Sequence, residues 1–252
     1  MLKVLSMIDA YQINAPCRLL LQLIQVASSK DVRFLIGMFL GATETSPAID
    51  ECRRRGFELA LFSKRHRYDP RLIFDVLKIV KRQGVMVLES HGYKTAVLAW
   101  SLRRLTGLPW VAVMHGHTSE NKRVALYNKL DLWTARSADR VIAVSTAMGN
   151  TLEQRGVPKS RLRVILNAVE PKAFQLEKDG REFRRNCGAS SEHLLVGVIA
   201  RLSPEKGVEV FLHAMKRIVK DVPCVKAVLV TQYARLYDSV LSDGGVQSPI
   251  GW

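Results

Sequence analysis

The chain has 252 residues, a length that suits one large domain or two domains of ordinary size. Hydrophobic residues make up 48% of it and charged residues 24%, which excludes disordered, collagen-like and low-complexity proteins. Its 38 Lys and Arg against 23 Asp and Glu give a net charge of +15, of which residues 1–170 hold +12. The four cysteines show no zinc-site or disulfide spacing, so we expect reduced, buried and inert thiols.

Seven apolar runs alternate with amphipathic stretches up to residue 170. Strands are expected at Leu2–Ile8, Val32–Leu40, Phe57–Phe62, Val85–Glu89, Pro109–Met114, Arg140–Val144 and Arg161–Leu166. Helices are expected at Pro16–Ala27, Pro47–Arg55, Pro70–Gln83 with Asp69 as its N-cap, Tyr93–Leu105, Asn121–Ser137 and Thr146–Arg155. Alternation of continuous Val, Ile and Leu strands with helices predicts a complete doubly wound α/β domain with a parallel sheet over residues 1–170.

The rest of the chain predicts only the start of a second α/β domain. Residues 171–192 are polar and read as a linker, and residues 193–231 contain one βαβ unit. That unit is expected as a strand at Leu194–Ala200, a helix at Glu205–Val219 and a strand at Lys226–Val230. Residues 232–252 form an irregular tail. One βαβ unit buries too little apolar surface to stand alone, so we expect this part to be loose.

Apolar spacing also predicts which face two of the helices bury. The predicted inward stripes are Leu19, Leu23 and Ala27 in one helix, and Val210, Ala214 and Ile218 in the other.

Basic residues are densest at Arg53–Arg55, at Lys64–Arg67 and around residues 78–82. The positive potential of these residues attracts phosphate groups. Three interpretations stay open: a solvated surface without a partner, contact with an anionic membrane, and contact with nucleic acid. No nucleic-acid-binding signature accompanies the charges, and we expect no nucleic-acid partner. The sequence shows neither a secretory signal nor the ~18 uninterrupted apolar residues of a membrane span. We expect a cytoplasmic protein, with a peripheral position on the inner face of the membrane left open.

The segment Ala200–Gly207 (ARLSPEKG) lies between an expected strand and an expected helix. A strand-to-helix turn presents backbone N–H groups, and the helix dipole favours an anion there. The forked guanidinium of Arg201 and the point charge of Lys206 would suit a diphosphate. The alternative is an ordinary helix start with two surface cations.

This segment resembles the Gly-Arg-Leu-x-x-Glu-Lys-Gly motif of glycosyltransferase family 4. Further segments resemble that family in the same order along the chain: His91–Lys94, Trp110–Asn121, Arg140–Met148 and Asn167–Glu170. The resemblance covers about residues 1–230. It implies the GT-B fold, here as one complete doubly wound domain plus the incomplete start of a second Rossmann-like domain.

The resemblance also implies roles for particular residues. Arg201, Lys206 and Ala15 would bind the diphosphate of a nucleotide-sugar donor, and the two cations would stabilise the leaving nucleoside diphosphate. His115 would be the catalytic residue against the transferred sugar, and His91 would lie on the acceptor side. Strand-end capping is the alternative for both histidines. His117 has no matching role.

The implied function is transfer of a sugar from a nucleotide-diphosphate donor to a sugar or lipid-linked acceptor, in cell-surface polysaccharide or glycolipid synthesis. No cofactor and no metal are expected. Two departures matter: Asn14-Ala15-Pro16 replaces a Gly-containing phosphate loop, and the family's Glu-x7-Glu motif has no counterpart. We therefore expect a C-terminally truncated member with impaired activity. The alternative is a non-catalytic remnant that binds an anionic membrane or an acceptor through its basic first domain. A dehydrogenase is disfavoured because no GxGxxG follows the first strand.

Overall fold

The computed structural model describes residues 1–27, 31–40, 45–63, 71–116, 122–169, 171, 180–203 and 206–231, without the side chains of 122–125. The chain divides into two compact units, unit 1 over Met1–Val169 and unit 2 over Glu170–Trp252. The expected N-cap Asp69, the basic run Lys64–Arg67, His117 and the irregular tail lie outside the described residues.

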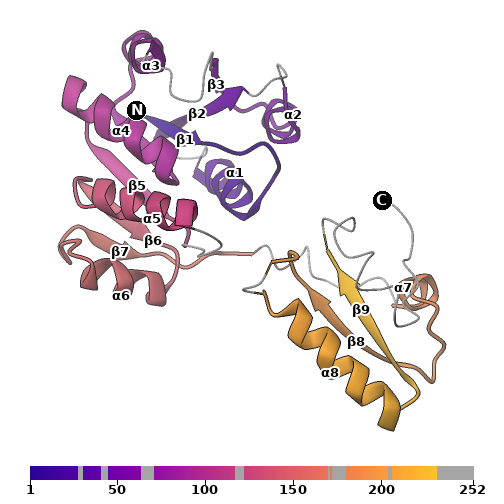
Figure 1. Ribbon diagram of the computed structural model, residues 1–252. Helices are drawn as coiled ribbons and strands as arrows, with labels where there is room; N and C mark the ends of the chain where they lie inside the picture. The colour runs from indigo at the N-terminus through magenta and orange to yellow at the C-terminus, as the bar shows by residue number, and fades with distance from the viewer. Residues whose placement is uncertain are drawn as a thin grey trace. The chain divides into compact units, whose positions relative to one another are not determined.

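Unit 1 is built on one parallel sheet of seven strands (Figure 1). They are β1 (Leu2–Ile8), β2 (Val32–Leu40), β3 (Leu59–Ser63), β4 (Val87–His91), β5 (Trp110–Met114), β6 (Arg140–Ala143) and β7 (Leu162–Val164). Their order across the sheet is β3-β2-β1-β4-β5-β6-β7, with every neighbouring pair parallel. The α/β prediction of a doubly wound parallel sheet is therefore confirmed. Each of the seven strands overlaps its expected range, but β4 begins and ends two residues later than expected.

Six helices connect these strands. They are α1 (Ala15–Ala27), α2 (Pro47–Arg54), α3 (Arg71–Arg82), α4 (Tyr93–Thr106), α5 (Lys122–Ala135) and α6 (Thr146–Gln154). Alternate residues of β2 belong to different cores: Leu35 packs with residues of α3 and α4, whereas Ile36 and Met38 pack with residues of α1 and α2. Because successive strand residues point to opposite faces, α1 and α2 cover one face of the sheet and α3 and α4 cover the other.

The predicted inward stripes of two helices are wrong. In α1 the buried residues are Cys17, Leu20, Leu21 and Ile24, whereas Leu23 is 46% exposed. In the helix of unit 2 the buried residues are Val208 and Met215, whereas Val210 is 73% exposed. Of the four cysteines expected to be buried, Cys17 and Cys52 are, whereas Cys187 is half-buried and Cys224 is exposed, so that expectation is wrong for the last two. Burial raises the pKa of the Cys17 thiol to about 11 and that of the Cys52 thiol to about 12. Protonated, enclosed thiols of this kind are unreactive.

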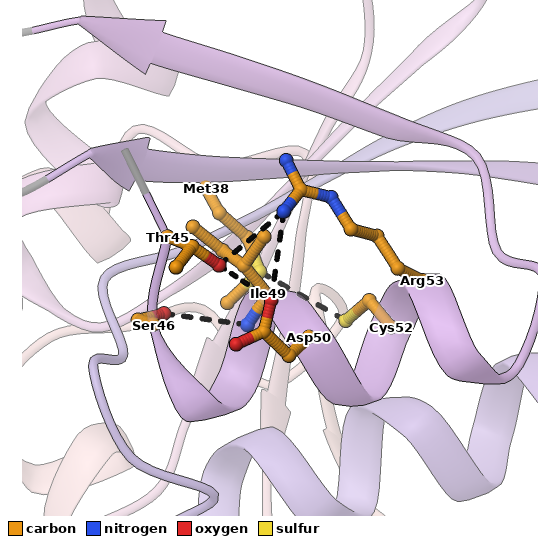
Figure 2. Close-up of polar contacts among 7 residues, drawn as sticks. All are labelled: Met38, Thr45, Ser46, Ile49, Asp50, Cys52 and Arg53. Carbon is orange, nitrogen blue, oxygen red and sulfur yellow. Dashed lines mark hydrogen bonds and ion pairs between the residues drawn. The ribbon is translucent and has the colours of Figure 1, made fainter. Parts of the chain in front are cut away.

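The start of α2 shows how the first basic run is neutralised. Ser46 caps the helix by accepting a hydrogen bond from the backbone N–H of Ile49 at 3.3 Å. Figure 2 shows the Arg53 guanidinium donating to Thr45 and contacting Asp50, and the Cys52 thiol directed toward Met38. The Arg53–Asp50 ion pair measures 3.5 Å.

The other two arginines of this run pair with one carboxylate. Arg54 and Arg55 both bond Glu51, at 2.7 and 2.6 Å. The hydrogen bond from Arg54 is the largest cause and that from Arg55 the next largest, and they lower the pKa of Glu51 to about 2. Each guanidinium of the Arg53–Arg55 run therefore has a carboxylate within its own helix, and the run attracts phosphate less than its composition indicates.

Unit 2 contains a parallel pair of strands, β8 (Leu194–Ile199) and β9 (Val225–Val230), joined through α8 (Val208–Asp221) and preceded by α7 (Arg181–Asn186). Figure 1 shows α8 lying along this pair. Several apolar side chains of the pair remain exposed, including Ile199 at 84% and Leu194 at 57%. Among the described helices of both units, none is long and apolar enough to cross a membrane.

Candidate active site

The strand order of unit 1 reverses direction at one point, between β1 and β4. From β1 the chain proceeds outward to β2 and β3, then returns to β4 on the other side of β1 and continues to β7. Ligands of open α/β sheets bind beyond the carboxyl ends of the strands at such a switch point. Ile8 is paired with His91 across it, and His91 is paired with Val113 of β5. The switch point therefore places His91 and the end of β5 together.

The helix α1 begins just beyond the end of β1. Asn14 accepts a hydrogen bond from the backbone N–H of Cys17 at 3.0 Å, and so caps the helix. Pro16 has no N–H, which leaves the N–H of Ala15 as the remaining donor of the first turn. Ala15 is exposed. The residue predicted to contact phosphate is thus at the positive end of a helix, with one backbone donor instead of the several that a Gly-rich loop presents.

Two histidines lie in direct contact at the carboxyl edge of the sheet. His91 is the last residue of β4, and His115 follows the last residue of β5. Nδ1 of His91 lies 2.8 Å from Nε2 of His115, and the two rings stack with their centroids 5.1 Å apart. The structure therefore brings together the predicted catalytic and acceptor-side histidines. The sequence predicts separate roles for them and does not indicate a hydrogen bond between them.

Sequence reasoning missed two residues of this cluster, Glu89 and Ser6. Oε2 of Glu89 lies 3.3 Å from Nε2 of His91, close enough for an ion pair but not aligned as a hydrogen bond. The hydroxyl of Ser6 donates to the same carboxylate oxygen. Ser6 and Glu89 are paired neighbours in β1 and β4, and both are buried. The two-residue spacing of Glu89 and His91 within one strand is the signal that could have revealed this shared face.

The charges in the cluster are set by enclosure and by each other. Burial opposes ionisation of Glu89, but His91, the Ser6 hydroxyl and His115 together hold the pKa of this carboxyl below its usual value. Burial is the largest influence on the ring of His115 and lowers its pKa to about 4. At neutral pH the cluster thus contains an ionised carboxylate and a neutral His115 that can donate or accept a hydrogen bond.

The predicted diphosphate-binding cations lie in unit 2, after β8 and before α8. Arg201 and Lys206 are both exposed. The backbone N–H of Lys206 donates to the carbonyl of Ser203, and Gly207 precedes α8 with a left-handed φ of 63°. The strand–turn–helix placement predicted for this motif is present. Within the described ranges, no group of three His, Cys, Asp or Glu side chains is arranged to hold a metal ion.

The family model described as Glycosyltransferase Family 4 matches residues 25–173, more than half of the chain. The chain belongs to glycosyltransferase family 4. The resemblance inferred from its motifs is therefore confirmed, and the histidine pair and the switch point fall within the matched region.

Two curated relatives are similar in sequence to this chain. One is an uncharacterized glycosyltransferase of Methanocaldococcus jannaschii, 23% identical over 165 residues, which are 59% of this chain and 42% of the relative. The other is the Escherichia coli UDP-Gal:alpha-D-GlcNAc-diphosphoundecaprenol alpha-1,3-galactosyltransferase, 24% identical over 61% of this chain and 41% of the relative. The chain thus spans about two fifths of the length of these relatives.

Solved structures share its fold. The crystal structure of Anabaena HepE in complex with UDP-glucose has a TM-score of 0.74 at 19% identity, covering 95% of this chain and 64% of that one. A glycosyltransferase from Rickettsia africae has a TM-score of 0.64 at 14% identity, covering 91% and 68%. The GT-B type of α/β fold expected from the motifs is therefore confirmed.

Proposed function

We propose that this chain carries the acceptor-side domain and the beginning of the donor-side domain of a glycosyltransferase. The reaction moves a sugar from a nucleotide-diphosphate donor to a sugar or lipid-linked acceptor, in the synthesis of cell-surface polysaccharide or glycolipid. The observation that carries this proposal is the bonded pair His91–His115 at the switch point of a family 4 sheet. The names of the relatives support the substrates: one uses UDP-Gal and a diphosphoundecaprenol acceptor, and HepE was crystallised with UDP-glucose.

We assign the roles as follows. Arg201 and Lys206 hold the diphosphate and stabilise the charge that develops on the leaving nucleoside diphosphate, so that transfer needs no metal. Ala15, at the N-terminus of α1, offers its backbone N–H to a phosphate group of the donor. His115 contacts the transferred sugar through a ring nitrogen, and His91 faces the acceptor. No organic cofactor enters this reaction, because the donor itself carries the activated group.

Binding of UDP tests the donor side of this proposal. Replacing Arg201 or Lys206 by alanine removes one charge-assisted contact, which should weaken UDP binding by roughly 10- to 100-fold, or ~1.5–3 kcal/mol. Isothermal titration calorimetry on the full chain measures this. Arg217→Ala, which removes an exposed cation from α8 of the same unit, is the matched control and should bind UDP as the wild type does. Equal binding by the wild type, Arg201→Ala and Lys206→Ala would remove both residues from the donor site.

A second candidate function, attachment to an anionic membrane surface, is favoured by one observation on α5. Leu126, Leu130 and Trp133 are 63%, 37% and 50% exposed and recur at helical spacing, so they form one apolar stripe. Trp133 packs against Trp100 of α4, whose ring has the Arg104 guanidinium 5.4 Å from its centroid. Apolar and aromatic side chains beside cations are typical of helices that lie in a membrane interface. This stripe would supply the peripheral membrane position that the net charge alone left open.

Sedimentation with vesicles of anionic lipid tests this second candidate. We expect the wild-type chain to bind such vesicles, and Trp133→Ala to bind roughly 10- to 100-fold more weakly, because a buried aromatic contributes ~1.5–3 kcal/mol. Phe74→Ala, which removes a 61% exposed aromatic from α3, is the control and should leave binding unchanged. Equal loss in both variants, or no binding by the wild type, would exclude the α5 stripe as a membrane site.

A further inference from the structure

A row of polar side chains crosses the switch point on one face of the sheet. Residues paired in a parallel sheet share a face, and so do residues two apart in one strand. Ser6 is paired with Glu89, Ile8 with His91, and His91 with Val113, two residues before His115. Ile8 packs in the core beneath α1 and α2. Ser6, Glu89, His91 and His115 therefore all lie on the face that these two helices cover.

Glu89 is an unusual occupant of a sheet interior. Its side chain is 9% exposed, and that of His91 is 3% exposed. A buried carboxylate is costly unless partners compensate its charge, and here the described partners are the Ser6 hydroxyl and His91. The surrounding pairs in β1 and β4 are otherwise apolar or small: Val4 with Val87, Leu5 with Leu88, and Met7 with Ser90.

The carboxylate determines which ring nitrogens of the two histidines carry hydrogen. Ionised Glu89 favours a proton on the ring nitrogen that faces it, which is Nε2 of His91. A neutral His91 protonated at Nε2 has a lone pair on Nδ1, and can only accept there. The 2.8 Å contact with His115 then requires that Nε2 of His115 carries the hydrogen and donates it. In the opposite neutral tautomer, a lone pair of His91 would face the lone pairs of the carboxylate at 3.3 Å. A doubly protonated His91 would instead donate from Nδ1 and leave the hydrogen of His115 on its own Nδ1, which the experiment below distinguishes.

This series of contacts ends at Nδ1 of His115. With its hydrogen on Nε2, neutral His115 has a bare lone pair on Nδ1. Among the described residues, Nδ1 of His115 is buried and has no hydrogen-bond partner. A buried acceptor without a donor is costly in a folded protein, and it gains a partner when a hydroxyl-bearing ligand arrives.

We propose that Glu89 is a positioning residue, which fixes the tautomer of His91 and through it that of His115, so that Nδ1 of His115 accepts a hydrogen bond from a hydroxyl group of the bound sugar. The inference rests on the proposed function for the identity of the ligand, but the tautomers themselves do not depend on it. Ser6 holds the carboxylate in place from the neighbouring strand. His115 thus enters the reaction as an acceptor for a sugar hydroxyl, and the hydrogen that it donates stays within the protein.

Nitrogen-15 NMR of the imidazole rings in the full chain tests the inference without any substrate. The His91→Gln and His115→Gln variants assign the two rings among the six histidines. At neutral pH we expect Nε2–H and an unprotonated Nδ1 for His115, and a proton on Nε2 of His91. In Glu89→Gln the carboxylate is replaced by a neutral amide, and we expect His115 to lose this preference and populate both tautomers. Glu58→Gln, at a carboxylate 50% exposed in its ion pair with Lys3, should match the wild type.

Two results would overturn the inference. One is a wild-type His115 that carries its hydrogen on Nδ1, and this decides the question even if Glu89→Gln fails to fold. The other is a folded Glu89→Gln whose His115 spectrum is identical to that of the wild type, which would leave Glu89 a purely structural role. UDP binding by the wild type, measured in parallel by calorimetry, tests the proposed function separately. Absence of UDP binding with the expected tautomers would contradict the proposed function and leave the positioning role intact.

Discussion

Replacing Trp110 by alanine should lower the free energy of unfolding of unit 1 by about 3–5 kcal/mol, the range for large-to-small changes of buried aromatic residues. Trp110 begins β5, is 0% exposed and packs in the core beneath α3 and α4. Its indole N–H donates to the hydroxyl of Ser90 at 2.9 Å, and Ser90 is itself 1% exposed. The alanine variant would therefore leave both a cavity and a buried hydroxyl that has lost its donor.

Urea denaturation followed by far-UV circular dichroism measures this change, and amide hydrogen exchange of β4 and β5 assigns the transition to unit 1. Trp133→Ala is the matched control, because it makes the same chemical change at a side chain that is 50% exposed. We expect its effect to stay below about 1 kcal/mol, as for other exposed positions. Comparable losses in the two variants would show that Trp110 is not packed as described.

Unit 1 should also lose stability as the pH falls from 6.5 to 4. Burial lowers the pKa of His115 from 6.5 to about 4, so the unfolded chain takes up this proton first as the solution is acidified. Uptake by the unfolded state favours unfolding, so the stability contributed by neutral His115 is complete above pH 6.5 and declines toward pH 4. The expected loss by pH 4 is roughly 2–3 kcal/mol. The lowered pKa of Glu89 adds a further loss below its usual range, where the unfolded carboxyl is protonated first.

Urea unfolding of the wild type and of His115→Gln at several pH values measures this contribution. The variant lacks the titrating ring, so its free energy of unfolding should depend less steeply on pH between 6.5 and 4. His213→Gln, which replaces an exposed histidine of α8 in unit 2, should keep the wild-type slope for unit 1. Parallel curves for the wild type and His115→Gln would show that His115 is not enclosed as the fold requires.

The strands of this protein could be predicted well from sequence because each is a continuous apolar run between turn-forming residues. The inward faces of α1 and α8 could not be predicted from rows of residues four apart. Four residues turn a helix of 3.6 residues per turn by about 400°, so the row Leu19, Leu23 and Ala27 drifts by about 40° at each step. Three residues turn the helix by about 300° and four by about 400°, so a mixture of these two spacings keeps side chains on one face. The buried residues of α1 and the pair Val208 and Met215 follow spacings of three, four and seven.

The candidate site could be predicted only in part. The two histidines follow apolar strands and resemble family motifs, so both could be found from the sequence. The apolar run predicts a strand that ends at Glu89, whereas β4 continues through it to His91. A lone carboxylate within a strand gives no signal of its partner when that partner, Ser6, is 83 residues away and is brought near only by sheet pairing.

Because Ser6, Glu89 and His91 project from paired strands, their mutual spacing is a property of the sheet and not of the surrounding loops. Loops that connect these strands can therefore lengthen, shorten or exchange during divergence without disturbing the three side chains. A single-residue insertion within β1 or β4 is different, since it would turn Ser6 or the Glu89–His91 pair to the opposite face. We therefore expect the lengths of β1 and β4 to vary less among relatives of this chain than the lengths of the loops that connect them.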